Sequence, residues 1–171
     1  MRLVPLGVCL FVLQVLVSAS DDAPAARLRN FSSPAARFWI EQAVAGAIRR
    51  LDDPECRQVF ADFADGSGRA LADNLSALGA SPRQYLTTWV WFVEASHEPQ
   101  CGEKYGRTAY TAPGSRVIFI CGTRLVTPTS TGGSAERDVV IIHELLHSLG
   151  LGENPPTSKQ ITKQVTARCV R

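Results

Sequence analysis

Two histidines and a glutamate stand at a spacing that suits metal chemistry. His143, Glu144 and His147 form the pattern H-E-x-x-H within residues 139–149, a run that is otherwise apolar apart from Ser148. Four residues are just over one turn of an α-helix, so the two imidazoles would project from one face and could bind one metal ion. Glu144 would lie about 100° round the helix, beside that face. A carboxylate there could accept a proton from a metal-activated water and later deliver it to a leaving amine.

A chance match and a packing role are the alternatives to metal binding. The chain contains three histidines, and two of them fall in this pattern with the acidic residue in place, which makes chance a weak explanation. Two imidazoles on one face of a core helix would each need a buried hydrogen-bond partner. Zinc is a metal that histidine and carboxylate ligands bind well, so we expect zinc as the cofactor.

A catalytic zinc site needs a third protein ligand and an open position. Downstream of His147, Glu153 is the only acidic or histidine side chain. Gly150 and Gly152 permit the sharp turn that would bring this carboxylate back to the metal. The competing ligand is His97, far upstream. A single loop histidine is more often solvated than bound to metal, so we favour Glu153.

The motif resembles that of the zincin metalloproteases, and more narrowly the metzincin pattern H-E-x-x-H-x-x-G-x-x-H/D. His143, Glu144, His147 and Gly150 match this pattern, whereas Glu153 stands where metzincins have a histidine or an aspartate. The only methionine is the first residue, so the methionine that metzincins place in a turn below the metal is missing. The tail also resembles that of small, uncharacterised secreted bacterial proteins. The resemblance implies a zincin-like fold and a zinc peptidase with Glu144 as general base.

The amino terminus has the features of a secretory signal peptide. A basic residue precedes an apolar run, residues 3–17, and small residues follow it. The run is about fifteen residues long, short of the roughly 20 that span a bilayer. We therefore expect removal of residues 1–19, including Cys9, followed by a flexible leader over 20–33. The mature protein would be secreted or periplasmic, without stable membrane insertion.

Four cysteines would remain after export, and an even number in an exported chain favours disulfides. They are Cys56, Cys101, Cys121 and Cys169. Three pairings are possible. We favour Cys101 with Cys121, closing a hairpin-like segment, and Cys56 with Cys169, tying the tail to the helical half. A zinc site built from cysteines is the rival, but no two of them stand at CxxC spacing.

Residues 34–171 are expected to form one zincin-like domain of the α+β class, because about 150 residues suffice for a single compact core. We expect a small, mostly antiparallel sheet with the motif helix packed beneath it. Aromatic and β-branched residues predict strands within 87–94 and, most clearly, 116–121. Apolar residues at helical spacing predict three helices ahead of the motif helix, within residues 34–51, 56–63 and 71–78.

Composition limits the partners. The net charge of +2 falls by one when the signal peptide removes Arg2, so no nucleic-acid partner is indicated. We expect a monomer that acts on a peptide or protein substrate. The resemblance implies that an extended substrate pairs with an edge strand, at 107–111 or 116–121. The transition-state oxyanion would need a donor besides the metal, and the candidates are His97, Tyr105, Tyr110 and Arg124.

Two other functions remain open. The same zinc chemistry could serve an amidase that acts on cell-wall peptides or on another small amide. Alternatively, the metal could be held in a non-catalytic zinc-binding module. The presence of Glu144 argues against such a module, because a general base has no purpose in packing. The sequence does not separate a protein substrate from a small amide.

Overall fold

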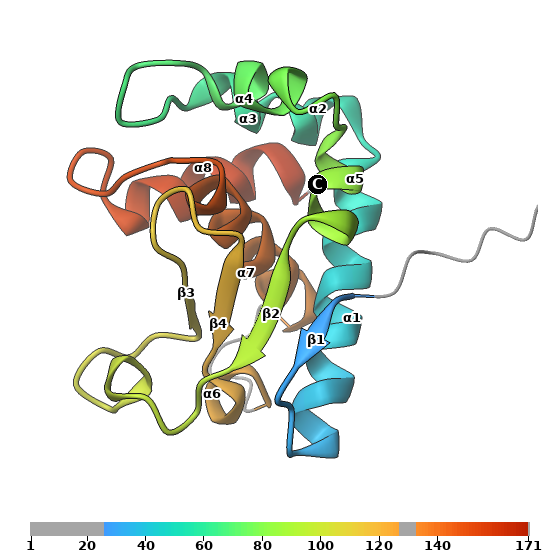
Figure 1. Ribbon diagram of the computed structural model, residues 1–171, viewed down its shortest axis with the longest axis vertical. Coiled ribbons are helices and arrows are strands. Elements are labelled where there is room, and N and C mark those ends of the chain that lie inside the picture. The colour runs from blue at the N-terminus through green and yellow to red at the C-terminus, as the bar shows by residue number, and fades with distance from the viewer. Residues whose placement is uncertain (1–25, 127–132, 171) are drawn as a thin grey trace, which may run out of the picture.

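A computed structural model describes residues 26–126 and 133–170, so the predicted signal peptide lies outside the described residues. The fold is α+β, as predicted (Figure 1). Its elements in chain order are β1 (Leu28–Arg29), α1 (Pro34–Leu51), α2 (Pro54–Arg57), α3 (Val59–Asp62), α4 (Leu71–Ala77), α5 (Pro82–Thr88), β2 (Trp91–Glu94), the 3-10 helix η1 (Pro99–Cys101), β3 (Ala109–Tyr110), β4 (Val117–Ile120), α6 (Gly122–Val126), α7 (Gly133–Ser148) and α8 (Ser158–Cys169). Within the described ranges, no helix is both long and apolar enough to cross a bilayer.

The helices predicted from apolar spacing are present. α1 begins after Ser33, whose side chain accepts a hydrogen bond from the amide of Ala36, and Pro34 occupies its first turn. The helix predicted over 56–63 is divided at Gln58 into α2 and α3. These helices form because each places an apolar stripe against the same core.

Two helices differ from the sequence-based expectation. α5 occupies residues 82–88 and includes the first two residues of the strand predicted over 87–94, which begins only at Trp91. The helix forms because Ser81 and Gln84 form a capping box around Pro82 in the first turn. α8 is not predicted at all. Its buried residues, Ile161, Val165 and Cys169, recur at every fourth position, a spacing that indicates one helical face.

The sheet is mixed, so the prediction of a mostly antiparallel sheet is wrong. The strand order among the described residues is β1-β2-β4-β3, with β1 and β4 both parallel to β2 and only β3 antiparallel to its neighbour β4. The connections explain the difference. A short turn joins β3 to β4, which gives an antiparallel pair, whereas long connections separate β1 from β2 and β2 from β4 and allow parallel pairing.

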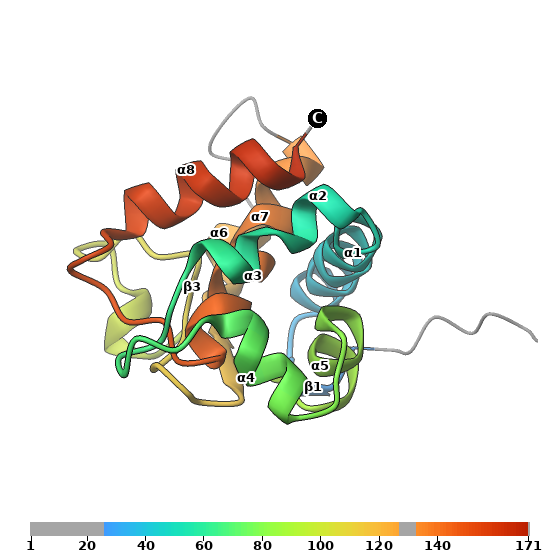
Figure 2. The same cartoon turned by 90° about the horizontal axis from the view of Figure 1, so that it is seen from above.

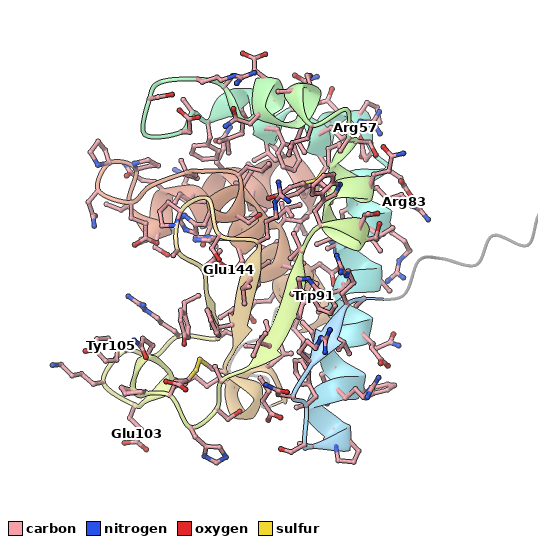
Figure 3. All side chains as sticks on the ribbon, in the orientation of Figure 1. Arg57, Arg83, Trp91, Glu103, Tyr105 and Glu144 are labelled. Carbon is pink, nitrogen blue, oxygen red and sulfur yellow. A yellow bond between two sulfur atoms is a disulfide. The ribbon has the colours of Figure 1, made fainter. Side chains whose placement is uncertain are left out.

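The end of the predicted flexible leader is attached to the sheet. Leu28 and Arg29 pair with β2, and the amide of Ser32 donates a hydrogen bond to Oε2 of Glu94 at 2.8 Å. The Arg29 guanidinium also lies 4.4 Å from the ring centre of Trp91, which Figure 3 shows beside β1. Within the leader expected over 20–33, Leu28, Arg29 and Ser32 are thus held at the sheet by backbone pairing, a hydrogen bond and a cation–π contact.

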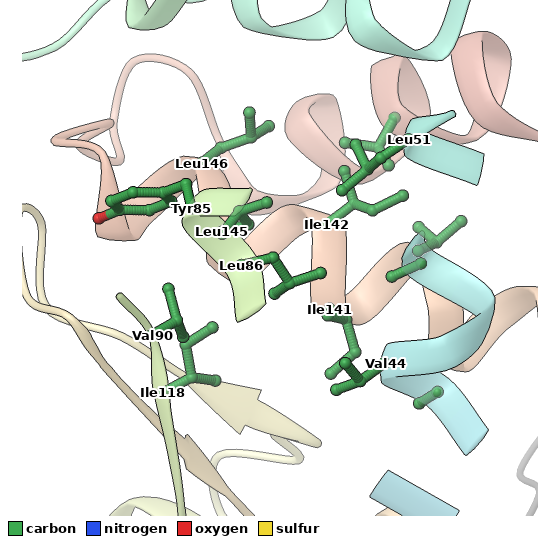
Figure 4. Packing of buried hydrophobic residues seen from close by; sticks show 14 of the residues in the cluster. Val44, Leu51, Tyr85, Leu86, Val90, Ile118, Ile141, Ile142, Leu145 and Leu146 are labelled. Carbon is green, nitrogen blue, oxygen red and sulfur yellow. The ribbon is translucent and has the colours of Figure 1, made fainter. Parts of the chain in front are cut away.

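The motif helix α7 packs against α1 on one side of the sheet (Figure 1). Figure 4 shows Val44 and Leu51 of α1 against Ile141 and Ile142 of α7. The two helices approach closely at Gly46, where an added Cβ would lie only 2.0 Å from Oδ1 of Asp138. Burial of these apolar side chains fixes the axis and the rotation of α7, and with them the direction in which its functional residues point.

Both favoured disulfides, Cys56–Cys169 and Cys101–Cys121, are present. Figure 2 shows α8 lying across α7, and the first disulfide joins its C-terminal end to α2. The second joins η1 to the end of β4, beside the apolar contact of Tyr110 and Phe119. The tail of the chain is thereby locked to the helical half.

Removal of the Cys56–Cys169 disulfide in a Cys56→Ser/Cys169→Ser variant should lower the free energy of unfolding by about 2–5 kcal/mol. The two residues are 113 positions apart, so the crosslink restricts a long loop of the unfolded chain. Urea denaturation measures the change. The Cys101→Ser/Cys121→Ser variant is the control and should lose less, because its residues are 20 positions apart. Two or more reactive thiols per chain in the wild-type protein, denatured without a reducing agent, would contradict the predicted pairing.

Candidate metal centre and active-site cleft

α7 brings the residues of the H-E-x-x-H motif to the base of a cleft. His143 and Glu144 are 6% exposed and His147 is 5% exposed. Beyond Ser148 the chain reverses direction at Gly150, which has a φ of 110°, a value that favours glycine. The amide of Gly150 donates to the carbonyl of His147 at 2.9 Å and closes the helix. This reversal returns the chain toward the face that carries the two imidazoles.

The turn that follows α7 is held from two neighbouring helices. The Asn74 side-chain amide of α4 donates to the Leu149 carbonyl at 3.0 Å. The Tyr85 hydroxyl of α5 donates to the Ser148 carbonyl at 3.0 Å. These bonds satisfy carbonyls that have no partner inside the helix and fix the path of the chain toward Glu153.

Three potential metal ligands converge at this turn. Nε2 of His143 lies 3.0 Å from Nε2 of His147, which lies 3.4 Å from Oε1 of Glu153. All three donor atoms lie within 4.8 Å of one another. Bonds of about 2.0–2.1 Å at a tetrahedral angle would place neighbouring donors about 3.3 Å apart. The group therefore fits a single metal ion, and the structure brings together the three residues that the sequence spacing predicts.

Hydrogen bonds to the far side of each ring orient the two imidazoles. Nδ1 of His147 lies 2.7 Å from the Leu151 carbonyl, which can only accept, so Nδ1 carries the proton and Nε2 presents a lone pair to the site. Nδ1 of His143 lies 3.0 Å from the Thr162 hydroxyl oxygen. In the tautomer that His147 adopts, with the proton on Nδ1, His143 donates a hydrogen bond to this oxygen. Two lone pairs and a carboxylate oxygen then face one another, an arrangement that a cation stabilises.

Burial and the charge of His147 together lower the pKa of His143 to about 4. The ring is therefore neutral near pH 7. A neutral imidazole is the form that binds metals, because the protonated ring has no lone pair to donate.

The Thr162→Val substitution should weaken metal affinity about tenfold, because it removes the oxygen that orients His143 but keeps the shape of the side chain. Competition with a chromophoric chelator measures the affinity. Thr166→Val is the control, since this hydroxyl of the same helix donates to the Thr162 carbonyl and not to an imidazole. An equal loss in both variants would show that α8 was generally disturbed and that the contact with His143 has no specific role.

Glu144 lies beside the candidate ligands but is not one of the three. Within the described chain, its Oε2 atom and the nearby Thr111 hydroxyl are buried without a hydrogen-bond partner. Burial raises the pKa of Glu144 to about 7, the Thr111 hydroxyl lowers it, Glu153 raises it and Arg107 lowers it. The hydroxyl is thus close enough to influence the carboxyl, although the geometry of a full hydrogen bond is lacking. An unpartnered buried carboxylate oxygen is costly to folding, which is typical of a functional residue.

The cleft above these residues has a volume of about 570 Å³. One wall is the segment 105–111, which includes β3, and the base is formed by the motif residues and Val140 of α7. Ser158 and Thr162 of α8 also line the cleft, as do Pro113 and Glu153. The cleft is large enough to admit several residues of an extended peptide at the level of Glu144.

Of the four predicted oxyanion donors, Tyr105 and Tyr110 line the cleft and His97 and Arg124 do not. His97 is an exposed residue that follows β2, and it does not belong to the group of potential metal ligands. Arg107 and Thr111 line the cleft at the ends of the segment 107–111 that the sequence indicated for substrate pairing, but the sequence reasoning gave neither residue a role of its own, and it missed Thr162. A sequence signal for the helix that carries Thr162 does exist, because Ile161, Val165 and Cys169 form the apolar stripe of α8.

No family model matches the chain, and searches of curated proteins and of solved structures find no significant match. The chemistry of the site is therefore interpreted from its own atoms. These are two oriented imidazoles, a converging carboxylate and a second, buried carboxylate at the base of a cleft.

Proposed function

We propose that this protein is a secreted or periplasmic zinc-dependent metallopeptidase of zincin-like type. The observation that carries the proposal is the convergence of Nε2 of His143, Nε2 of His147 and Oε1 of Glu153 beside the unpartnered Oε2 of Glu144. A metal held by three protein groups keeps a position open for water or substrate. The adjoining cleft supplies the space in which a substrate could reach that position.

Zinc is the metal proposed for the site. Two histidines and one carboxylate form a ligand set of catalytic zinc sites, and the same set also serves non-haem iron. The buried Glu144 favours zinc, because hydrolysis needs a proton acceptor beside the metal. When bound, zinc supplies a Lewis acid and lowers the pKa of water to about 7.

The protein residues would divide the remaining work among them. Glu144 accepts a proton from the attacking water at its buried carboxylate and delivers it to the nitrogen of the leaving amine. Tyr110 and Tyr105 are the candidates to donate a hydrogen bond to the oxyanion, since both line the cleft. Thr162 and the Leu151 carbonyl keep the two imidazoles in their orientation.

The position of β3 favours an extended peptide as substrate. β4 has strand neighbours on both sides, whereas β3 is the last strand of the sheet, which leaves 107–111 as the segment suited to pair with a substrate. Ala109 and Tyr110 of this strand also line the cleft. A peptide added along this edge would pass over Glu144 with its backbone hydrogen-bonded to the protein.

The two disulfides are compatible with export. The proposal is tested by metal analysis of folded, oxidised protein and by digestion of a peptide library and of cell-wall fragments, read by mass spectrometry. One zinc per chain and cleavage of peptides are expected. Cleavage confined to cell-wall fragments would favour the amidase, iron in place of zinc would overturn the assigned chemistry, and zinc without any cleavage would indicate a binding module.

A further inference from the structure

Arg107 occupies an unusual place in the cleft. Among the described residues that line it, Arg107 is the only lysine or arginine, and it stands two residues before β3. The side chain is exposed, so the guanidinium is accessible from solvent. The histidine and acidic side chains of the lining are those of His143, His147, Glu144 and Glu153.

Among the described residues, the guanidinium of Arg107 forms no ion pair with a carboxylate. The guanidinium carbon lies 5.5 Å from the centre of the Tyr105 ring. Burial raises the pKa of both Glu144 and Tyr110, and the positive charge of Arg107 opposes this rise in each, so the guanidinium lies within electrostatic range of both side chains.

We infer that Arg107 forms a subsite for a carboxylate of the substrate, either an acidic side chain or the C-terminal carboxylate. This inference rests on the proposed function, because it concerns a substrate that lies in the same cleft. A guanidinium presents two parallel N–H groups that match the two oxygens of a carboxylate. A guanidinium that no carboxylate of the described chain engages keeps that fork available to a ligand.

Lys104 offers a matched comparison within the same loop. Its Nζ atom also lies 5.5 Å from the centre of the Tyr105 ring, and Figure 3 shows Tyr105 and Glu103 on this loop between β2 and β3. Lys104 carries the same charge as Arg107 but does not line the cleft. A general effect of positive charge would therefore appear in both residues, whereas a subsite would involve Arg107 alone.

The test uses one set of hexapeptides with Glu at each position in turn and a matched set with Gln at the same positions. Each peptide is made in two forms, with a free C-terminal carboxylate and with a C-terminal amide. kcat/KM is measured for the wild type, Arg107→Ala and Lys104→Ala. The wild type should prefer one acidic peptide over its neutral partner about three- to tenfold, the range expected for a partly exposed charged pair. Arg107→Ala should bring this ratio close to one, and Lys104→Ala should preserve it. Preference for Glu identifies a side-chain carboxylate, and preference for the acid over the amide identifies the terminal one.

Several results would overturn the subsite. These are a wild type without preference, an equal loss of preference in Lys104→Ala, or an Arg107→Ala variant in which kcat falls equally for acidic and neutral peptides. The last result would place Arg107 at the transition state. If the wild type hydrolyses no peptide, the proposed function fails, and titration calorimetry of the same peptide pairs still decides the subsite through their binding ratio. A true preference should also shrink between about 0.1 M and 1 M salt, as the screening length falls from about 10 Å to about 3 Å.

Discussion

Replacement of Glu144 by glutamine is expected to reduce hydrolysis by about 10²–10⁴-fold while zinc stays bound, because a general base typically contributes that factor. Glutamine keeps the shape of the side chain and loses the ability to accept and return a proton. The metal should stay, since its three candidate ligands are His143, His147 and Glu153. The fold should also stay, because Oε2 of Glu144 has no hydrogen-bond partner in the described chain that the substitution could break.

The measurement combines kcat with the zinc content of the same sample. Glu103→Gln is the control for a change of charge, because Glu103 is exposed on the loop before β3 and does not line the cleft. Undiminished turnover in Glu144→Gln would reject the role of general base. Loss of zinc together with activity would instead show that Glu144 helps to bind the metal, and the division of roles within the motif would have to be revised.

The positions of Glu144 and of two candidate ligands could be predicted from sequence because their geometry is local. The spacing of His143 and His147 fixes their common face once the segment is a helix, and the apolar run around them makes it one. Glu153 was predictable for a different reason, since no other suitable side chain follows the motif and Gly150 can turn the chain back. Each of these inferences involves residues close together along the chain.

The features that escaped prediction depend on contacts between distant segments. The parallel pairing of β2 with β4 arises from a long connection, and strands of two to four residues carry too short a pattern to reveal their partners. Thr162 reaches His143 only because α8 folds back over α7 and is tied to α2 by Cys56–Cys169. Arg107 belongs to no motif, and its role depends on the wall that β3 forms above the motif helix.

Zinc binding is expected to weaken at least tenfold in Glu153→Ala, since the substitution removes a direct ligand and even the loss of an outer contact typically costs 10–100-fold. The side chain of Glu153 is 40% exposed, so its removal should leave the core and the free energy of unfolding of the metal-free protein nearly unchanged. His143→Ala and His147→Ala should lose zinc more completely, because each removes an imidazole that is already oriented by a hydrogen bond.

Two further variants separate Glu153 from its competitor. Glu153→His should retain zinc, because an imidazole at this position can also bind the metal and is the residue that the metzincin pattern allows. His97→Ala should leave the affinity unchanged, because His97 is exposed and lies outside the converging group. Chelator competition at one pH measures the affinities of all five variants, since proton release makes metal binding depend on pH. Zinc loss in His97→Ala together with full affinity in Glu153→Ala would place the third ligand in the loop after β2 and would end the metzincin-like interpretation of the site.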